Sequence, residues 1–239
     1  DQETYQQDIV VHRTTGTAYQ EDVGPLRIWH IYVGDHCRED YGDVRFTDST
    51  GAELAYYLWP DYDSSSARFT VRLEGADAAG ATQIHYGNPT ATTTSDGTST
   101  FLFFDDCEGS DPSDKWIEVA GTGTATYETD PYLGTKALKV SGKSKYVAGR
   151  MDPVTSAIFE ARIKQTGTNN GCFFTAIGST SDYTFYAFRP DYTNVAQLFK
   201  FAAGTATPAA SNTSVPSTTW QRITMIPNPS TAMFAVYVD

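Results

Sequence analysis

The segment Arg68-Phe69-Thr70-Val71-Arg72-Leu73 decides the fold class of this 239-residue chain. Apolar and polar residues alternate along it, so that Phe69, Val71 and Leu73 fall on one face of an extended strand. The same alternation predicts that the two arginines and Thr70 lie on the opposite, solvent face. One apolar face with a period of two is typical of an antiparallel sheet that covers a core.

Similar patterns recur on both sides of this segment, separated by turns rich in Gly, Pro and Asp, and no sustained helical period interrupts them. The expected strands are Asp8–Arg13, Leu26–Val33, Val44–Thr47, Ala52–Trp59, Gln83–Tyr86, Ala137–Val140, Ala157–Lys164, Cys172–Ile177, Tyr183–Phe188, Gln197–Phe201, Trp220–Ile226 and Met233–Val238. Leu26–Val33 is apolar on both faces, which predicts a central strand. The sequence therefore predicts an all-β protein built from two antiparallel, jelly-roll-like β-sandwich domains.

The charge balance narrows the classes of partner. The formal net charge is −12, with 17 Lys and Arg against 29 Asp and Glu. A surface this acidic repels nucleic acid and anionic membranes. The sequence has no apolar run long enough for a transmembrane segment. Its first residues do not resemble a signal peptide and are compatible with a mature N-terminus.

The chain changes character at Phe101-Leu102-Phe103-Phe104-Asp105-Asp106-Cys107-Glu108, hereafter the octet. Four apolar residues run directly into four mostly acidic or polar ones, with no flexible linker. We interpret Phe101–Phe104 as the last strand of one domain and the acidic half as the first loop of the next. The predicted domains are residues 1–101 and 102–239. A strong strand pattern runs up to Asp239, which predicts that the second sandwich is truncated there or completed by a neighbour.

Three segments resemble an uncharacterised domain family of archaeal, especially methanogen, and some bacterial cell-surface proteins. They are residues 36–51, with Cys37 followed by Asp43-Val44-Arg45-Phe46-Thr47, then Ile84-His85-Tyr86-Gly87-Asn88-Pro89, and then the octet. Cys107 stands where the last motif usually has Phe. The resemblance implies an extracellular location, and it brings no catalytic residue with it. In that family a laminin-G or concanavalin-like jelly roll often follows, and residues 116–239 resemble one.

Patterns of catalytic residues are missing, so the chain is predicted not to be an enzyme. Glycosidases need two carboxylates facing one cleft, and concanavalin-like hydrolases carry them on one strand, whereas Glu160 stands alone on its strand. The sequence contains no Gly-x-Ser-x-Gly motif and no phosphate-binding loop. His12, His30, His36 and His85 are scattered without zinc-ligand spacing.

Acidic residues gather just after the apolar half of the octet. Asp105, Asp106, Glu108, Asp111 and Asp114 lie within ten residues of one another, where turns can bring oxygens onto one ion. Concanavalin-like binding domains often hold a structural Ca²⁺ near their first strand, and we therefore predict these five residues as calcium ligands. The alternative is a set of solvated acids, with Asp114 capping a turn.

Three further predictions concern cysteines, aromatic residues and glycosylation. The cysteine count fits one bridge plus one buried thiol, or three buried thiols; in an extracellular setting we predict a Cys37–Cys107 disulfide. Tyr186 and Phe188 share one face of a strand and are candidates for stacking on sugar rings, with a core position as the alternative. Asn212-Thr213-Ser214 is a glycosylation acceptor sequence.

These observations predict a non-catalytic extracellular module of an archaeal cell envelope that acts in binding or adhesion, with carbohydrate as the ligand. One alternative is a structural subunit of a surface layer, sheath or filament, in which copies of the chain associate through strand edges. A second alternative is an accessory module of a glycan-active enzyme. Binding to a glycan array would favour the first hypothesis, and self-assembly into sheets or tubes would favour the structural subunit.

Overall fold

The computed structural model describes residues 5–9, 26–31, 36–64, 66–73, 82–120, 122–141, 146–149, 159–164, 173–175, 185–190, 196–202, 205–212, 220–228 and 233–238. Its elements are β1 (Tyr5–Ile9), β2 (Leu26–Ile31), β3 (Arg45–Thr47), β4 (Tyr56–Leu58), β5 (Ala67–Arg72), β6 (Thr82–Tyr86), α1 (Gly97–Thr100), a 3-10 turn (Pro112–Asp114), β7 (Trp116–Ala120), β8 (Thr124–Glu128), β9 (Ala137–Ser141), β10 (Tyr146–Gly149), β11 (Phe159–Ile163), β12 (Phe173–Thr175), β13 (Phe185–Pro190), β14 (Ala196–Ala202), β15 (Thr205–Asn212), β16 (Gln221–Asn228) and β17 (Met233–Val238).

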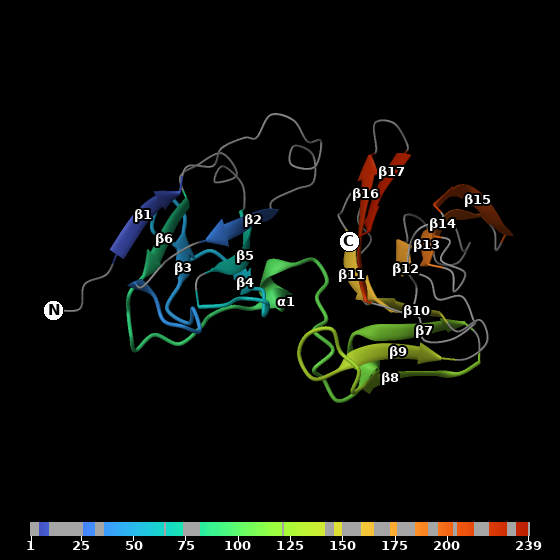
Figure 1. Cartoon of the computed structure of the whole chain (residues 1–239), viewed down its shortest axis with the longest axis horizontal. Coiled ribbons are helices and arrows are strands. Elements are labelled where there is room, and N and C mark those ends of the chain that lie inside the picture. Colours follow the sequence, from blue (N-terminus) through green and yellow to red (C-terminus); the bar gives the residue numbers. More distant parts are fainter. Residues whose placement is uncertain are drawn as a thin grey trace. The chain divides into compact units, whose positions relative to one another are not determined.

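The fold class is all-β, and the paired strands are antiparallel, as predicted. Contacts between residues divide the chain into two compact units, the first holding β1 to β10 and the second β11 to β17 (Figure 1). That division differs from the predicted 1–101 and 102–239, which stays a prediction for independently folding domains. In the part of the chain that the structure describes, no helix is long and apolar enough to cross a membrane.

The first unit contains a sandwich of two three-stranded sheets, with strand orders β1-β6-β3 and β2-β5-β4. Phe46 of β3 and Ile84 of β6 come from one sheet, and Tyr56 of β4 with Phe69 and Val71 of β5 comes from the other; all five are buried in one cluster. The ring of Phe46 lies 5.3 Å from that of Tyr56 and 5.3 Å from that of Phe69. This aromatic contact joins the two sheets and forms the centre of the core.

The predicted burial pattern of β5 is confirmed for its inner face and is wrong for one residue of its outer face. Phe69, Val71 and Leu73 are buried as predicted. Thr70 is buried as well, at 2% exposure, because Trp59, which directly follows the neighbouring strand β4, covers it and donates its indole N–H to the Thr70 hydroxyl over 3.0 Å. The outer face of this sheet is therefore covered by aromatic side chains instead of facing water.

The prediction of a central strand at Leu26–Val33 is wrong for the residues that the structure describes, because there β2 lies at one end of the order β2-β5-β4 and β5 takes the central place. The first unit also contains two antiparallel strand pairs, β7 with β10 and β8 with β9. The second unit contains the sheets β11-β16-β17 and β12-β13-β14-β15.

Candidate functional site

The apolar half of the octet is not a strand, contrary to the prediction. Asp96 caps the short helix α1 by accepting the N–H of Thr98 over 2.8 Å, and the N–H of Phe101 closes the turn on the carbonyl of Gly97 over 2.9 Å. This turn interrupts any strand pairing. Phe101 then stacks on Phe104 with ring centres 5.7 Å apart.

The stacked pair of Phe101 and Phe104 covers β4. Phe104 lies 4.7 Å from the ring of Tyr57, and Phe101 lies 6.2 Å from that of Trp59. On the other side of the octet, Phe103 meets Trp116, the first residue of β7, edge to face at 5.1 Å. The apolar half of the octet is thus a packed connection and not a flexible linker.

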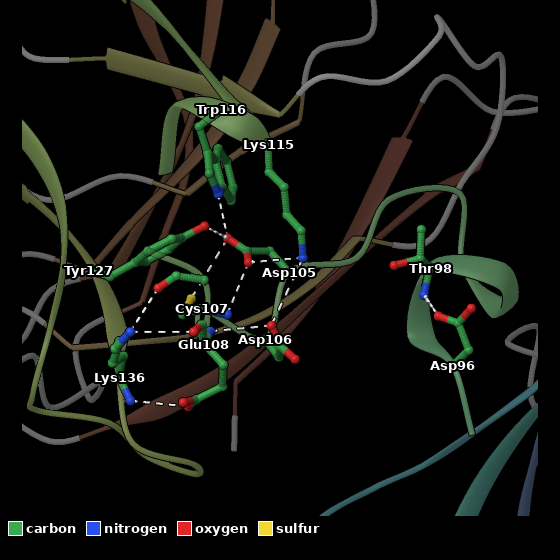
Figure 2. A network of polar contacts seen from close by, with 11 residues as sticks. Asp96, Thr98, Asp105, Asp106, Cys107, Glu108, Lys115, Trp116, Tyr127 and Lys136 are labelled. Carbon is green, nitrogen blue, oxygen red and sulfur yellow. Dashed lines mark hydrogen bonds and ion pairs between the residues drawn. The ribbon is translucent and has the colours of Figure 1, made fainter. Parts of the chain in front are cut away.

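Asp105 is the centre of a polar network (Figure 2). Its side chain is 4% exposed. The indole N–H of Trp116 and the hydroxyl of Tyr127 donate to one carboxylate oxygen over 2.5 and 3.0 Å. The other oxygen accepts the N–H of Cys107 over 2.9 Å and lies 3.4 Å from the Lys115 ammonium. A buried carboxylate is expensive unless it is paired, and these partners supply the pairing.

The same burial keeps the neighbouring thiol of Cys107 and hydroxyl of Tyr127 protonated. Burial, followed by the negative charge of Asp105, raises the pKa of the Cys107 thiol to about 12. Burial and the hydrogen bond to Asp105 also raise the pKa of Tyr127 above its ordinary range. At neutral pH the thiol and the hydroxyl therefore stay uncharged, and the network anchors the chain without providing a nucleophile.

Glu108 fastens the octet to the loop that precedes β9. One carboxylate oxygen accepts the backbone N–H groups of Thr135 and Lys136 over 2.6 and 3.1 Å, and the other accepts the Thr135 hydroxyl. Lys136 in return donates to the carbonyl of Gly109 over 2.8 Å. The hydrogen bond from the Thr135 hydroxyl is the main cause that lowers the pKa of Glu108.

The three other predicted calcium ligands are Asp106, Asp111 and Asp114. Asp106 accepts the N–H of Glu108 over 3.3 Å and lies 3.9 Å from the Lys115 ammonium. Asp111 caps the 3-10 turn by accepting the N–H of Ser113 over 2.8 Å, and Asp114 lies within that turn.

Calcium at these five carboxylates stays a prediction, and the observed geometry adds no support to it. Asp105 and Glu108 are committed to N–H and O–H donors on different elements. Among the residues that the structure describes, no three His, Cys, Asp or Glu side chains form a group that could hold a metal ion. A calcium site would need six to eight oxygens converging on one point.

The predicted Cys37–Cys107 disulfide is not formed, because both residues are free thiols in the structure. The two sulfur atoms lie in different surroundings. Cys37 packs against the core of the N-terminal sandwich, whereas Cys107 lies beside Asp105. Burial raises the pKa of Cys37 to about 11, with a smaller contribution from the charge of Asp43. Cys172 lies outside the described residues.

Polar residues of the quoted motifs also close loops. Asp43, only 3% exposed, accepts the N–H of Arg38 over 3.0 Å and the N–H of Gly87 over 2.7 Å. This one carboxylate joins the loop before β3 to the turn after β6. The φ of Gly87 is +94°, a left-handed conformation that glycine adopts without strain.

Two arginines hold the segment that follows this turn. The Arg38 guanidinium donates to the carbonyl of Ala91 over 2.6 Å, and that of Arg45 donates to the carbonyl of Thr92. Arg45 also donates to the Tyr56 hydroxyl over 3.2 Å. Arg38, Asp43, Arg45 and Gly87 of the quoted motifs therefore hold loops of the fold together.

Sequence reasoning missed the partners of the octet, namely Lys115, Trp116, Tyr127 and Thr135. The sequence pointed to Trp116, because the strand patterns that follow the octet begin at this residue. Tyr127 is 22 residues from Asp105, and nothing local in the sequence marks that contact.

The remaining site predictions fall in the second unit. Tyr186 and Phe188 lie in β13, opposite Lys200 and Leu198 of β14. Asn212 is the last residue of β15, and Thr213 and Ser214 of the acceptor sequence lie outside the described residues. The side chains of Tyr186, Phe188 and Asn212 are outside the described part as well, so stacking and glycosylation stay predictions.

Comparisons with known proteins match one domain family over part of the chain and give no activity. No curated protein matches the sequence. A carbohydrate-binding module, CBM66 from Bacillus subtilis, resembles the structure with a TM-score of 0.40 and 17% identity over 52% of this chain and 74% of that chain. A likeness of that size carries no argument about ligand or mechanism. The predicted presence of an uncharacterised domain is confirmed, because residues 40–119 match the family described as Domain of unknown function (DUF2341).

Proposed function

We propose that this chain is a non-catalytic module of an extracellular protein on an archaeal cell envelope and that it binds carbohydrate. The observation that carries the proposal is the register of the sheet β12-β13-β14-β15. Tyr186 of β13 lies opposite Thr175 of β12 and Lys200 of β14, and Lys200 lies opposite Thr207 of β15. One face of the sheet therefore carries a row with one aromatic, one basic and two hydroxyl residues.

This combination of residues suits a sugar. An aromatic ring packs against the C–H face of a pyranose, while hydroxyl and ammonium groups can bond the sugar hydroxyls beside it. Phe188, two residues along β13, lies opposite Phe173 and Leu198 and adds an apolar row next to the first. A sheet face with such rows accommodates an extended saccharide better than a small compact ligand.

The state of the described carboxylates supports a non-catalytic role. Asp105 and Asp43 accept hydrogen bonds from buried or half-buried donors, and the pKa of Glu108 is lowered by the hydrogen bond from the Thr135 hydroxyl. A glycosidase needs one carboxyl with a raised pKa as its acid. The pKa of Glu108 is instead lowered, and Asp105 and Asp43 serve as acceptors for hydrogen bonds within the fold, which suits a structural role.

A glycan array with the full chain tests the proposal. We expect binding to a subset of glycans, loss of binding for Tyr186→Ala, and unchanged binding for Tyr132→Ala, which removes a 45% exposed tyrosine from the first unit. Circular dichroism of both variants controls for folding. Retention of full binding by Tyr186→Ala would remove the proposed face, and release of reducing sugar ends would contradict the non-catalytic role.

A structural subunit is the second candidate, and β17 favours it. Within the described part of the chain, β17 pairs with β16 alone and lies at one end of the order β11-β16-β17. Its sequence, Met-Phe-Ala-Val-Tyr-Val, has none of the charges or prolines that usually protect a sheet edge. Electron microscopy of concentrated protein should then show ordered assemblies, and Ala235→Lys on this strand should abolish them.

A further inference from the structure

Basic residues gather on one face of the sheet β11-β16-β17. Arg162 of β11 lies directly opposite Arg222 of β16. One step along the same face, the Lys164 ammonium lies 5.2 Å from the ring centre of Trp220, which immediately precedes β16. We call Arg162, Lys164, Trp220 and Arg222 the basic stripe.

The register separates this face from the apolar one. Ala161 and Ile163 of β11 alternate with the basic residues, and Ala161 lies opposite Ile223 of β16. Antiparallel sheets commonly bury an apolar face and leave the polar face to solvent. The side chains of the basic stripe are half-buried, and each takes part in a polar or ring interaction within the protein, so the stripe is held in place.

The charge of the stripe stands out in this protein. Two like charges directly opposite each other on neighbouring strands destabilise a sheet. The described stretch of β11 and β16 adds one acid, Glu160, to the same face, against three basic residues. The whole chain has a formal net charge of −12, so a row of basic residues is a local departure from its acidic character. A face on which basic residues outnumber acidic ones attracts anions.

The identity of the anion follows from the neighbours of the arginines. Guanidinium groups bind carboxylate and sulfate oxygens through paired N–H donors. Trp220 offers an aromatic face beside them, which suits a sugar ring more than an isolated inorganic ion. Nucleic acid also combines anions with flat rings, but its many phosphates would be repelled by the acidic remainder of the chain.

We propose that the basic stripe binds an anionic glycan, one that carries uronic-acid carboxylates or sulfate groups. This inference rests on the proposed carbohydrate-binding function and adds a ligand class and a second surface to it. The stripe lies on the sheet β11-β16-β17, whereas the row with Tyr186 lies on the sheet β12-β13-β14-β15.

Calorimetric titration of the full chain with three polymers tests the inference. Polygalacturonate offers carboxylates, dextran sulfate offers sulfates, and dextran is neutral. We expect at least one anionic polymer to bind more tightly than dextran, and we expect this binding to weaken as NaCl rises from about 50 to about 500 mM because the contacts are ionic. The combination of Arg162→Gln with Arg222→Gln should weaken it by about tenfold or more.

Lys139→Gln with Arg72→Gln is the matched control, because it lowers the net charge equally in the first unit. These two residues lie on β9 and β5. Equal loss of affinity in the control and in the stripe variant would overturn the inference in favour of a general charge effect. Binding of neutral glycans on an array, unaffected by the stripe variant and without preference for anions, would overturn the inference and leave the proposed function standing. Failure of every glycan to bind would overturn both.

Discussion

The indole N–H of Trp116 donates to the carboxylate of Asp105 over 2.5 Å, although that carboxylate is only 4% exposed. This bond connects the octet to the first residue of β7. With the hydroxyl of Tyr127 on the same oxygen, it makes Asp105 the polar centre of the segment between the N-terminal sandwich and the strands that follow it. The first prediction concerns this residue.

Asp105→Ala should lower the free energy of unfolding of the first unit by about 2–4 kcal/mol. The substitution leaves the N–H of Trp116 and the hydroxyl of Tyr127 without their acceptor in a buried place, and each such loss costs about 1–3 kcal/mol. Urea denaturation followed by Trp fluorescence measures the change. Asp106→Ala is the matched control, because its carboxylate is 48% exposed and should matter by less than about 0.5 kcal/mol. Equal effects of both substitutions would contradict the assigned role of Asp105.

Cys37 and Cys107 should react slowly with iodoacetamide at neutral pH, because burial raises their pKa values to about 11 and about 12. Only the thiolate is nucleophilic, so alkylation should accelerate as the pH rises toward those values. Both pKa values are higher in the folded chain than in the unfolded chain. The contribution of the two thiols to stability should therefore be fully present below the ordinary thiol pKa of about 8.5, and it should be lost as the pH rises above that value. Mass spectrometry of the alkylated protein follows the reaction, and a Cys37–Cys107 crosslinked peptide would contradict the free thiols.

For Glu108 we expect the opposite dependence of stability on pH, in the acidic range. Its pKa is lowered in the folded protein, first by the hydrogen bond from the Thr135 hydroxyl, so its contribution is present above the ordinary carboxyl pKa. That contribution should disappear as the pH falls through the lowered value. Thermal melting of Glu108→Gln should therefore depend less on pH in the acidic range than melting of the unchanged protein. Glu39→Gln, at an exposed loop position, should leave the acid dependence intact.

Gly134→Ala should destabilise the chain more than Gly51→Ala. Both glycines have positive φ, +76° and +87°, so alanine at either position costs about 1–2 kcal/mol of backbone strain. A Cβ at Gly134 would in addition collide with the Glu108 carboxylate, whereas a Cβ at Gly51 would meet nothing within 4 Å. The difference in melting temperature between the two variants reports the contact with Glu108. Identical melting temperatures would show that Glu108 moves aside at no cost.

The strands of the first unit could be predicted from the alternation of apolar and polar residues. Phe69, Val71 and Leu73 are buried because side chains two residues apart in a strand lie on the same face. The burial of Thr70 could not be predicted in this way, because it is covered by Trp59, which follows the neighbouring strand β4. The prediction of a strand in the octet was wrong for a related reason. Its four apolar residues have high strand propensity, but the turn capped by Asp96 precedes them and their rings pack on Tyr57 and Trp59.

The acidic half of the octet shows a second limit of the sequence. Spacing marked Asp105 and Glu108 as a group, and that proximity along the chain suggested a shared ion. Their actual partners, Tyr127 and Thr135, come from elements 22 and 27 residues away, and these donors are invisible in any local window. Donors contributed by distant turns can satisfy a carboxylate as completely as a cation can.

The contacts of Asp105 and Glu108 also decide where the chain can be divided. The family match ends at residue 119, after Trp116 but before Tyr127, Thr135 and Lys136. A fragment cut at that point would keep the buried carboxylate and lose one of its donors, and it would leave Glu108 without its loop. Since β7 also pairs with β10, expression of this domain, and its exchange between proteins by recombination, should succeed only when the transferred segment extends through β10 to Gly149.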